Sequence, residues 1–252
     1  NGHTYYYDKN GILLRNRWKT IQDHTYYFTK DGTAATGNTR IQGTYYLFTS
    51  SGCLYNPTKK AVVSIQGNLF LVAPDGKTLS GYHKVQGHYY YAYPTGRLAT
   101  NEKVSYLRFK KNGQAKNDQK VKAKLAAKKF IKEHTDSSMN SWDKLCRCYR
   151  LILTGNHFAA GWFPKDAKSS PWQYEAAATM LSDPGLVGNC HFIASSVAAV
   201  AKELGYKPTI YTTLGAGHSY VVVKDTYFDN TKGTEFVRTT EEYPDPDESF
   251  IY

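Results

Sequence analysis

The sequence predicts a multidomain protein: an N-terminal all-β solenoid of stacked β-hairpin repeats, followed by a C-terminal α+β domain. Three observations predict this division. Aromatic segments recur about every twenty residues in the first half, and helical periodicity begins near residue 117. The positive net charge is confined to the first half. We therefore expect one domain over residues 1–116 and a second over residues 117–252.

The first domain is built from related segments that each contain a turn glycine. Each unit has an aromatic strand, a reversal containing Asp-Gly, Asn-Gly or Ser-Gly, and a shorter return strand. A single hairpin of this kind cannot bury its own aromatic face, so stacking of neighbouring hairpins must supply the core. The turn glycines are Gly11, Gly32, Gly52, Gly76, Gly96 and Gly113.

The clearest repeat runs from Arg17-Trp18-Lys19-Thr20-Ile21 through Tyr26-Tyr27-Phe28 and Asp31-Gly32 to Ala34-Ala35-Thr36-Gly37. It resembles the cell-wall-binding repeats of the choline-binding type and the related carbohydrate-binding repeats of clostridial toxins. In choline-binding members, aromatic cages between successive hairpins hold a quaternary ammonium by cation–π attraction. The resemblance therefore implies a ligand-binding array on the bacterial cell wall.

This chain departs from the choline-binding pattern in two ways. It keeps Trp18 at the cage-forming position, but Asn38 and Tyr82 stand at the equivalent positions of later units. The first aromatic of the repeated triplet is replaced by threonine in three units. Stacking of sugar rings on exposed tyrosines therefore fits better than a full choline cage, and the alternative is that the aromatic residues only hold the array together. The candidate ligand-binding residues are Trp18, Tyr26, Tyr46, Tyr82 and Tyr90.

Charge also suggests a partner for the repeats. Residues 1–117 carry 16 Lys and Arg against 5 Asp and Glu, a net charge of +11, and residues 118–252 carry 16 of each. This excess favours an anionic polymer, and the family resemblance makes wall teichoic acid or another cell-wall polysaccharide the expected partner. Nucleic acid is the competing anion, but no nucleic-acid-binding motif supports it. A scattered solvated basic surface is the remaining alternative.

The second domain is predicted to begin with helices near residues 121–132, 142–153 and 174–181. A further helix follows in the stretch Gly185 to Tyr206, with Asn189 as its N-cap and Gly205 at its end. Its large apolar residues fall on one narrow face and the rest are small, which predicts a buried helix. Cys190 then lies at the helix start, where the helix dipole favours a thiolate. Taken alone, this cysteine is better explained as a core residue.

The segments after this helix change that interpretation. Strands are predicted over residues 208–213, 218–223 and 226–229. In an antiparallel hairpin centred near Val223 and Lys224, His218 lies roughly opposite Asp229 on the same face. A histidine to take the thiol proton and a carboxylate to orient its ring are what a nucleophilic cysteine needs.

The order and spacing of these residues resemble the transglutaminase-like superfamily of papain-type cysteine enzymes. The matching residues are Gly188-Asn189-Cys190, Leu204-Gly205-Tyr206, His218-Ser219-Tyr220 and Asp229-Asn230-Thr231. The resemblance implies a papain-like, transglutaminase-like fold with Cys190 as nucleophile, His218 as general base and Asp229 as the orienting acid. Tyr220 and His191 depart from the residues usual at their positions.

The expected function is that of a cysteine protease or acyltransferase, a thiol enzyme acting on peptide or carboxamide bonds of a peptide or protein substrate. The backbone N–H of Cys190 is one expected oxyanion donor, and position alone suggests Trp172 or Gln173 as a second. We expect no cofactor, no metal and no membrane span, and a secreted, extracellular location at the bacterial cell wall. The alternative is a surface adhesin whose transglutaminase-like domain is a non-catalytic binding module.

Overall fold

The computed structural model describes residues 2–155, 172–183, 188–213, 217–233 and 248–252. The chain divides into two compact units, Asn1–Asn117 and Asp118–Tyr252, which we call unit 1 and unit 2. The boundary expected from the sequence, between residues 116 and 117, lies one residue away. In the described residues, no helix combines the length and the apolar character that crossing a membrane requires.

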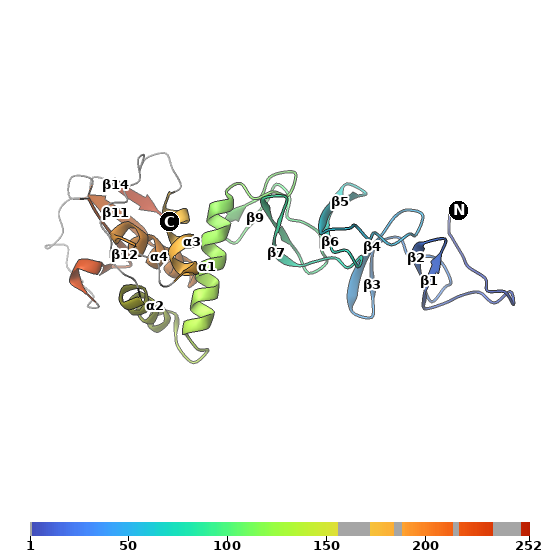
Figure 1. Cartoon of the computed structure of the whole chain (residues 1–252), viewed down its shortest axis with the longest axis horizontal. Helices are drawn as coiled ribbons and strands as arrows, with labels where there is room; N and C mark the ends of the chain where they lie inside the picture. The colour runs from blue at the N-terminus through green and yellow to red at the C-terminus, as the bar shows by residue number, and fades with distance from the viewer. Residues whose placement is uncertain (1, 156–171, 184–187, 214–216, 234–247) are drawn as a thin grey trace. The chain divides into compact units, whose positions relative to one another are not determined.

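Unit 1 consists of antiparallel hairpins in chain order (Figure 1). Their strands pair only with their immediate neighbours, so each hairpin is a separate two-stranded sheet. The strands are β1 (Arg17–Ile21), β2 (His24–Phe28), β3 (Gly37–Ile41), β4 (Thr44–Phe48), β5 (Ala61–Ile65), β6 (Asn68–Val72), β7 (Gly81–Val85), β8 (His88–Ala92), β9 (Lys103–Val104) and β10 (Leu107–Arg108).

The turns differ in role from the sequence prediction. Each of the first four hairpins closes on a two-residue turn that follows its first strand, such as Gln42-Gly43 between β3 and β4. Both turn residues have positive φ, 46° and 87°, as the type I′ hairpin turn requires. The Asp-Gly, Asn-Gly and Ser-Gly turns come after the second strand and lead into a short return segment. The expected hairpin at residues 3–14 is replaced by isolated bridges, including Tyr7 to Leu13.

The return segments join successive hairpins. A return segment donates a main-chain hydrogen bond to the second strand of the preceding hairpin. Leu54 N donates to Thr25 O in β2 at 2.7 Å, and Leu98 N donates to Leu69 O in β6 at 2.7 Å. The turn glycines also contribute to these junctions, because they lie against the return segment of the preceding repeat. A Cβ built on Gly96 would stand 2.1 Å from the Cβ of Thr78, so only glycine fits there. These contacts confirm the prediction that the hairpins stack.

In its described residues, unit 2 combines four α-helices with one antiparallel sheet (Figure 1). The helices are α1 (Asp118–His134), α2 (Ser141–Gly155), α3 (Trp172–Ser182) and α4 (Cys190–Glu203). The sheet has the order β13-β12-β11-β14, formed by β11 (Thr209–Thr213), β12 (His218–Val223), β13 (Thr226–Phe228) and the edge strand β14 (Glu248–Ile251). The α+β organisation agrees with the sequence prediction, which did not include β14.

Helix α4 lies at the centre of unit 2, in contact with the other three helices and with β11 and β12. Its residues Val197 to Ala201 are almost completely buried, and the small side chains on its faces allow this close packing. Lys124 of α1 forms a 2.6 Å ion pair with Glu203 in the last turn of α4. The helix that carries Cys190 is therefore fixed on all sides by the core.

Candidate active site

Cys190 is the first residue of α4, as the sequence predicts. The side chain of Asn189 caps the helix by accepting a hydrogen bond from the backbone N–H of His191 at 3.1 Å. Cys190 is 5% exposed, and its thiol lies 3.6 Å from the backbone oxygen of Gly217, the residue before β12. The cap and the buried helix therefore hold the cysteine beside the start of β12.

His218 and Asp229 come from the hairpin of β12 and β13, whose register differs from the prediction by two residues. Val223 pairs with Thr226, so Asp229 lies two positions away from the residue that would oppose His218. Side chains alternate between faces with a period of two, and a two-residue offset keeps both side chains on one face. The Nε2 atom of His218 lies 2.9 Å from Oδ1 of Asp229.

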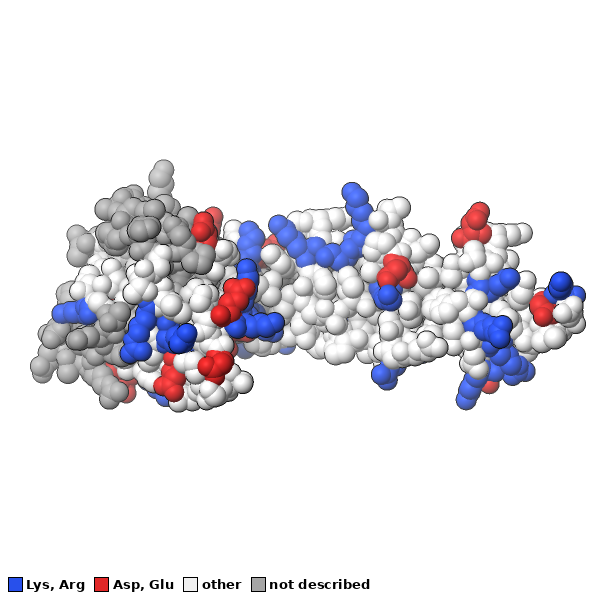
Figure 2. Space-filling view, turned by 60° about the horizontal axis from the view of Figure 1, so that its bottom comes forward, with Lys and Arg blue, Asp and Glu red and all other residues white. Residues whose placement is uncertain are grey.

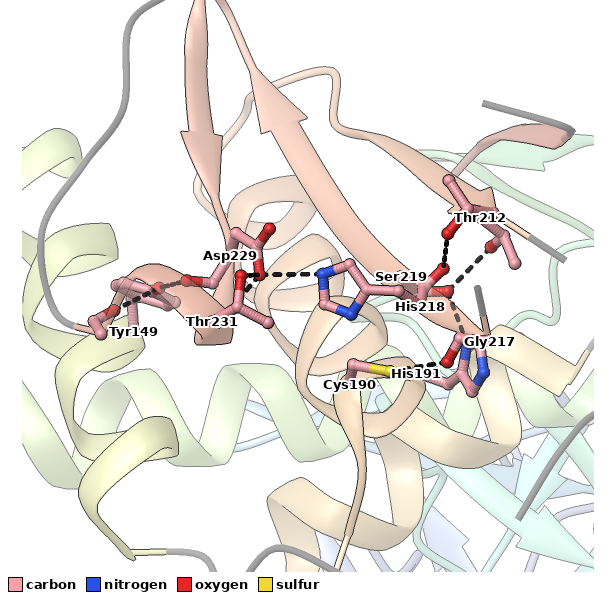
Figure 3. A network of polar contacts seen from close by, with 11 residues as sticks. Tyr149, Cys190, His191, Thr212, Gly217, His218, Ser219, Asp229 and Thr231 are labelled. Atoms are coloured by element: carbon pink, nitrogen blue, oxygen red, sulfur yellow. Dashed lines mark hydrogen bonds and ion pairs between the residues drawn. The ribbon is translucent and has the colours of Figure 1, made fainter. Parts of the chain in front are cut away.

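The imidazole of His218 stands between the Asp229 carboxylate and Cys190 (Figure 3). Burial alone would lower the pKa of His218, but the hydrogen bond to Asp229 and the interaction with Cys190 outweigh it and raise this pKa to about 9. Burial would raise the pKa of Asp229, yet its hydrogen bonds with His218 and Thr231 lower it. At neutral pH the site therefore holds an imidazolium ring against a carboxylate.

Two residues that the sequence analysis missed hold Asp229 in place. Thr231 donates both its backbone N–H and its hydroxyl to Oδ1 of Asp229, each at 2.9 Å. The buried hydroxyl of Tyr149, on α2, lies 2.8 Å from the backbone oxygens of both Asp229 and Gly233. The Asp-x-Thr spacing, typical of a carboxylate capping a short turn, was a signal for Thr231. Tyr149 is 80 residues from Asp229 and carried no such signal.

A second polar network is formed by the residues that follow Cys190 and His218 in the chain, together with Thr212. The Nδ1 atom of His191 is hydrogen-bonded to the Ser219 hydroxyl, which is also 2.8 Å from the Thr212 hydroxyl (Figure 3). All three side chains are buried. Burial, with a smaller contribution from the neighbouring His218, lowers the pKa of His191 to about 4. His191 is therefore neutral at the pH where His218 is charged, and the two histidines have different roles.

The predicted oxyanion residues begin helix α3. The Trp172 ring packs edge-on against the ring of His191, the residue after Cys190, with the ring centroids 5.7 Å apart. Gln173 is buried, and its side-chain oxygen has no hydrogen-bond partner among the described residues. The donor role of both residues stays a prediction. In the part of the chain that the structure describes, no three His, Cys, Asp or Glu side chains are grouped to hold a metal ion.

The candidate ligand residues of unit 1 fall into different environments. Trp18 is 40% exposed and packs against its cross-strand partner Tyr27 and against Tyr46 of the next hairpin, at 5.2 and 4.9 Å. Tyr82 pairs in the same way with Tyr91 at 4.8 Å. At the equivalent position of the second hairpin, Asn38 faces Leu47. Paired aromatic rings therefore mark the first and fourth hairpins.

The remaining candidate tyrosines, Tyr26 and Tyr90, have their rings or hydroxyls engaged within unit 1. Tyr26 stacks on Phe28, and its hydroxyl accepts a hydrogen bond from the thiol of Cys53 at 3.1 Å. Tyr90 is buried in a cluster with Leu71 and Leu98, so its assignment as a ligand residue is wrong. In a run of three tyrosines, the strand period places the middle ring on the face opposite its neighbours.

The sequence matches no protein-family model and no curated protein. Among solved structures it is similar to CbpJ from Streptococcus pneumoniae TIGR4, with 24% identity over 45% of this chain and 45% of CbpJ and a TM-score of 0.27. Choline binding protein F from S. pneumoniae is 25% identical over 46% and 47%, with a TM-score of 0.22. The autolysin LytC from S. pneumoniae is 23% identical over 44% and 28%, with a TM-score of 0.33. The chain spans less than half the length of each of these proteins.

Proposed function

We propose that unit 2 is a cysteine enzyme that transfers or hydrolyses acyl groups at peptide or carboxamide bonds. The observation that carries this proposal is the position of His218, whose ring is held by Asp229 on one side and meets Cys190 on the other. This arrangement supplies a nucleophile, a proton carrier and an orienting carboxylate from three separate elements. The transglutaminase-like family remains the expected class.

The proposed reaction has two stages. The Cys190 sulfur attacks the carbonyl carbon of the substrate amide, and an S–C bond forms while negative charge develops on the carbonyl oxygen. His218 then gives its proton to the departing amine as the C–N bond breaks, which leaves a thioester on Cys190. Water or an acceptor amine then attacks the thioester carbon and gives a proton to His218, the C–S bond breaks, and Cys190 leaves as a thiolate, which restores the starting state. Hydrolysis and cross-linking differ only in this acceptor.

The surroundings of the site support this chemistry. The raised pKa of His218 keeps the ring protonated near neutral pH, ready to donate to a leaving amine. The backbone N–H of Cys190, at the start of α4, remains the expected donor to an oxyanion formed beside the sulfur. Trp172 and Gln173 remain the candidates for a further donor.

Alkylation of Cys190 by iodoacetamide tests the proposal without knowledge of the substrate. Cys53 competes because it is only partly buried, so the assay uses a Cys53→Ser background and locates the adduct by peptide mass spectrometry. Cys146 and Cys148 serve as internal controls, since burial raises the pKa of both thiols, that of Cys148 to about 12. We expect Cys190 to react faster than a model thiol near neutral pH, and more slowly in His218→Gln. A rate no higher than that of the model thiol favours the non-catalytic binding module instead.

We further propose that unit 1 attaches the protein to a bacterial cell-wall polymer, either a polysaccharide or teichoic acid, after secretion. The support is its net charge of +11 and the half-exposed rings of its first and fourth hairpins. On the face of unit 1 seen in Figure 2, Lys and Arg form several separate groups and acidic residues are few. Such spacing suits contact with a repeating anionic chain at several points.

Binding to purified cell walls tests this second proposal. We expect retention of the full chain on walls, weaker retention in high salt, and weaker retention after phosphate is removed from the walls. Trp18→Ala should reduce retention further, because it removes the exposed ring of the first hairpin. Retention that survives both high salt and phosphate removal would show that the electrostatic contribution is wrong.

A further inference from the structure

A cleft of about 480 Å³ lies between the second and third hairpins of unit 1. This volume is within the range of small-molecule binding pockets, about 300–1,000 Å³. Its walls are formed by the residues before β3, the residues after β4, the return segment that follows, and the end of β5. The lining residues are Thr36, Gly37, Thr49, Ser50, Tyr55, Ser64, Ile65 and Gln66.

The lining carries hydroxyl and amide groups but no Lys, Arg, Asp or Glu. This is unexpected in a unit with a net charge of +11. Among the described residues, the side chains of Ser50, Ser64 and Gln66 have no hydrogen-bond partner. Hydroxyl groups both donate and accept, and so does an amide, so together they complement the hydroxyls of an uncharged sugar.

Tyr55 supplies an aromatic surface at this junction. Its backbone N–H donates to Leu47 O at 2.8 Å, the same bond that Ala35 makes to Tyr27, Leu79 to Leu71 and Ala99 to Tyr91 in the other repeats. These bonds show that the four residues occupy equivalent positions. Tyr55 is aromatic, whereas the other three are alanine or leucine. Its ring is half-buried against the cluster of Leu47, Phe70 and Val72, which fixes its orientation.

Another wall of the cleft differs from the corresponding part of the second and fourth hairpins. The strand register makes Ser64 equivalent to Thr20, Arg40 and Lys84, so a hydroxyl stands where two other hairpins carry a cation. The segment that leads from the return residue to the next hairpin is also longer here. Five residues separate Tyr55 from β5, while a single residue separates Ala35 from β3 and Leu79 from β7.

We propose that this cleft binds an uncharged oligosaccharide, with Tyr55 as the stacking surface and Ser64, Ser50 and Gln66 as hydrogen-bonding groups. The inference rests on the proposed attachment of unit 1 to the cell wall, and it assigns neutral glycan to this cleft and anionic polymer to the basic surface outside it. The two contributions then differ in salt dependence, because only the second is screened by ions.

NMR titration of the full-length, ¹⁵N-labelled chain tests the assignment. The probes are isomaltotriose, cellotriose and tri-N-acetylchitotriose, with poly(glycerol phosphate) as the anionic comparison. We expect one of the neutral trisaccharides to shift the signals of Tyr55, Ser64 and Gln66, with a Kd on the order of 1 mM that does not change with salt. Tyr55→Ala places in the cleft the residue found at positions 35 and 99, and we expect it to raise the Kd about tenfold or more.

Ser64→Arg introduces the residue that the second hairpin has at position 40, and it should weaken sugar binding too. Thr20→Arg makes the matching change in the first hairpin, away from the cleft, and should leave the Kd unchanged. The proposal is overturned if no neutral probe shifts these signals, if Tyr55→Ala binds as wild type, or if only poly(glycerol phosphate) shifts them. Retention on cell walls, measured in parallel, remains intact in all three cases if the wider proposal for unit 1 is correct.

Discussion

The hydrogen bond between His218 Nε2 and Asp229 Oδ1, 2.9 Å long, directs the other edge of the imidazole ring toward Cys190 (Figure 3). Asp229→Asn keeps the shape of this contact but removes the charge that helps to raise the pKa of His218. Since one pKa unit corresponds to about 1.4 kcal/mol, we expect the alkylation rate of Cys190 near neutral pH to fall by about tenfold or more. Asp225→Asn, on the exposed turn of the same hairpin, is the control. Equal rates in the two variants would contradict the prediction.

The pKa of His218 also predicts how stability depends on pH. The folded-state value of about 9 is above the ordinary 6.5, so folding favours the protonated ring. This stabilisation is fully present below pH 6.5 and is lost as the pH rises through about 9. Urea unfolding of wild type and His218→Gln should give a difference in unfolding free energy that shrinks across this interval. A constant difference would argue against the charged pair.

His191 predicts the opposite behaviour on the acid side. Its folded-state pKa of about 4 is below 6.5, so the neutral ring stabilises the fold above pH 6.5 and this stabilisation is lost as the pH falls toward 4. His191→Asn offers an amide to Ser219 and does not titrate. In urea unfolding at successive pH values, wild type should lose more stability than His191→Asn between pH 6.5 and 4. Parallel curves would be inconsistent with a buried neutral histidine.

Tyr149 is predicted to act as a positioning residue for Asp229. Tyr149→Phe leaves the Asp229 and Gly233 carbonyl oxygens without this donor, which should cost about 1–3 kcal/mol of unfolding free energy. Movement of Asp229 should also shift the pH profile of Cys190 alkylation, and a purely structural role would leave that profile unchanged. Tyr211→Phe is the control, because the Tyr211 hydroxyl has no hydrogen-bond partner among the described residues.

The turn glycines of unit 1 predict a contrast between two substitutions with similar backbone geometry. Gly96 and Gly87 have φ of 85° and 88°, but a Cβ meets Thr78 at the first position and nothing within 4 Å at the second. Gly87→Ala should cost about 1–2 kcal/mol from backbone strain alone. Gly96→Ala should cost about 1–3 kcal/mol more, since it overpacks the junction. Urea unfolding followed by near-UV circular dichroism measures both, and equal losses would mean that the junction yields to the added methyl group.

Much of the candidate site followed from the sequence because it depends on local periodicity. Asn189 marks a helix start by its residue type, which makes Cys190 the first residue of the helix. The two-residue error in the β12–β13 register left His218 and Asp229 on the same face. Tyr149 did not follow, since its contact with Asp229 depends on how α2 packs against the sheet.

The repeats illustrate a different limit. Their period identified stacked hairpins, but Gln-Gly and Asp-Gly turns both suit tight reversals, so the sequence did not show which of them joins paired strands. Tyr90 was misassigned because adjacent tyrosines hide the alternation of buried and exposed faces.

A main-chain hydrogen bond joins each return segment to the preceding repeat, and this bond recurs whether the next residue is Ala35, Tyr55 or Leu79. The side chain at the position of Ala35, Tyr55 and Leu79 can therefore change in size while this main-chain bond is kept. One scaffold can thus present a basic surface at one step and a neutral, hydroxyl-lined one at the next. In the proposed attachment to a cell-wall polymer, each step would then contribute its own selectivity to the combined avidity.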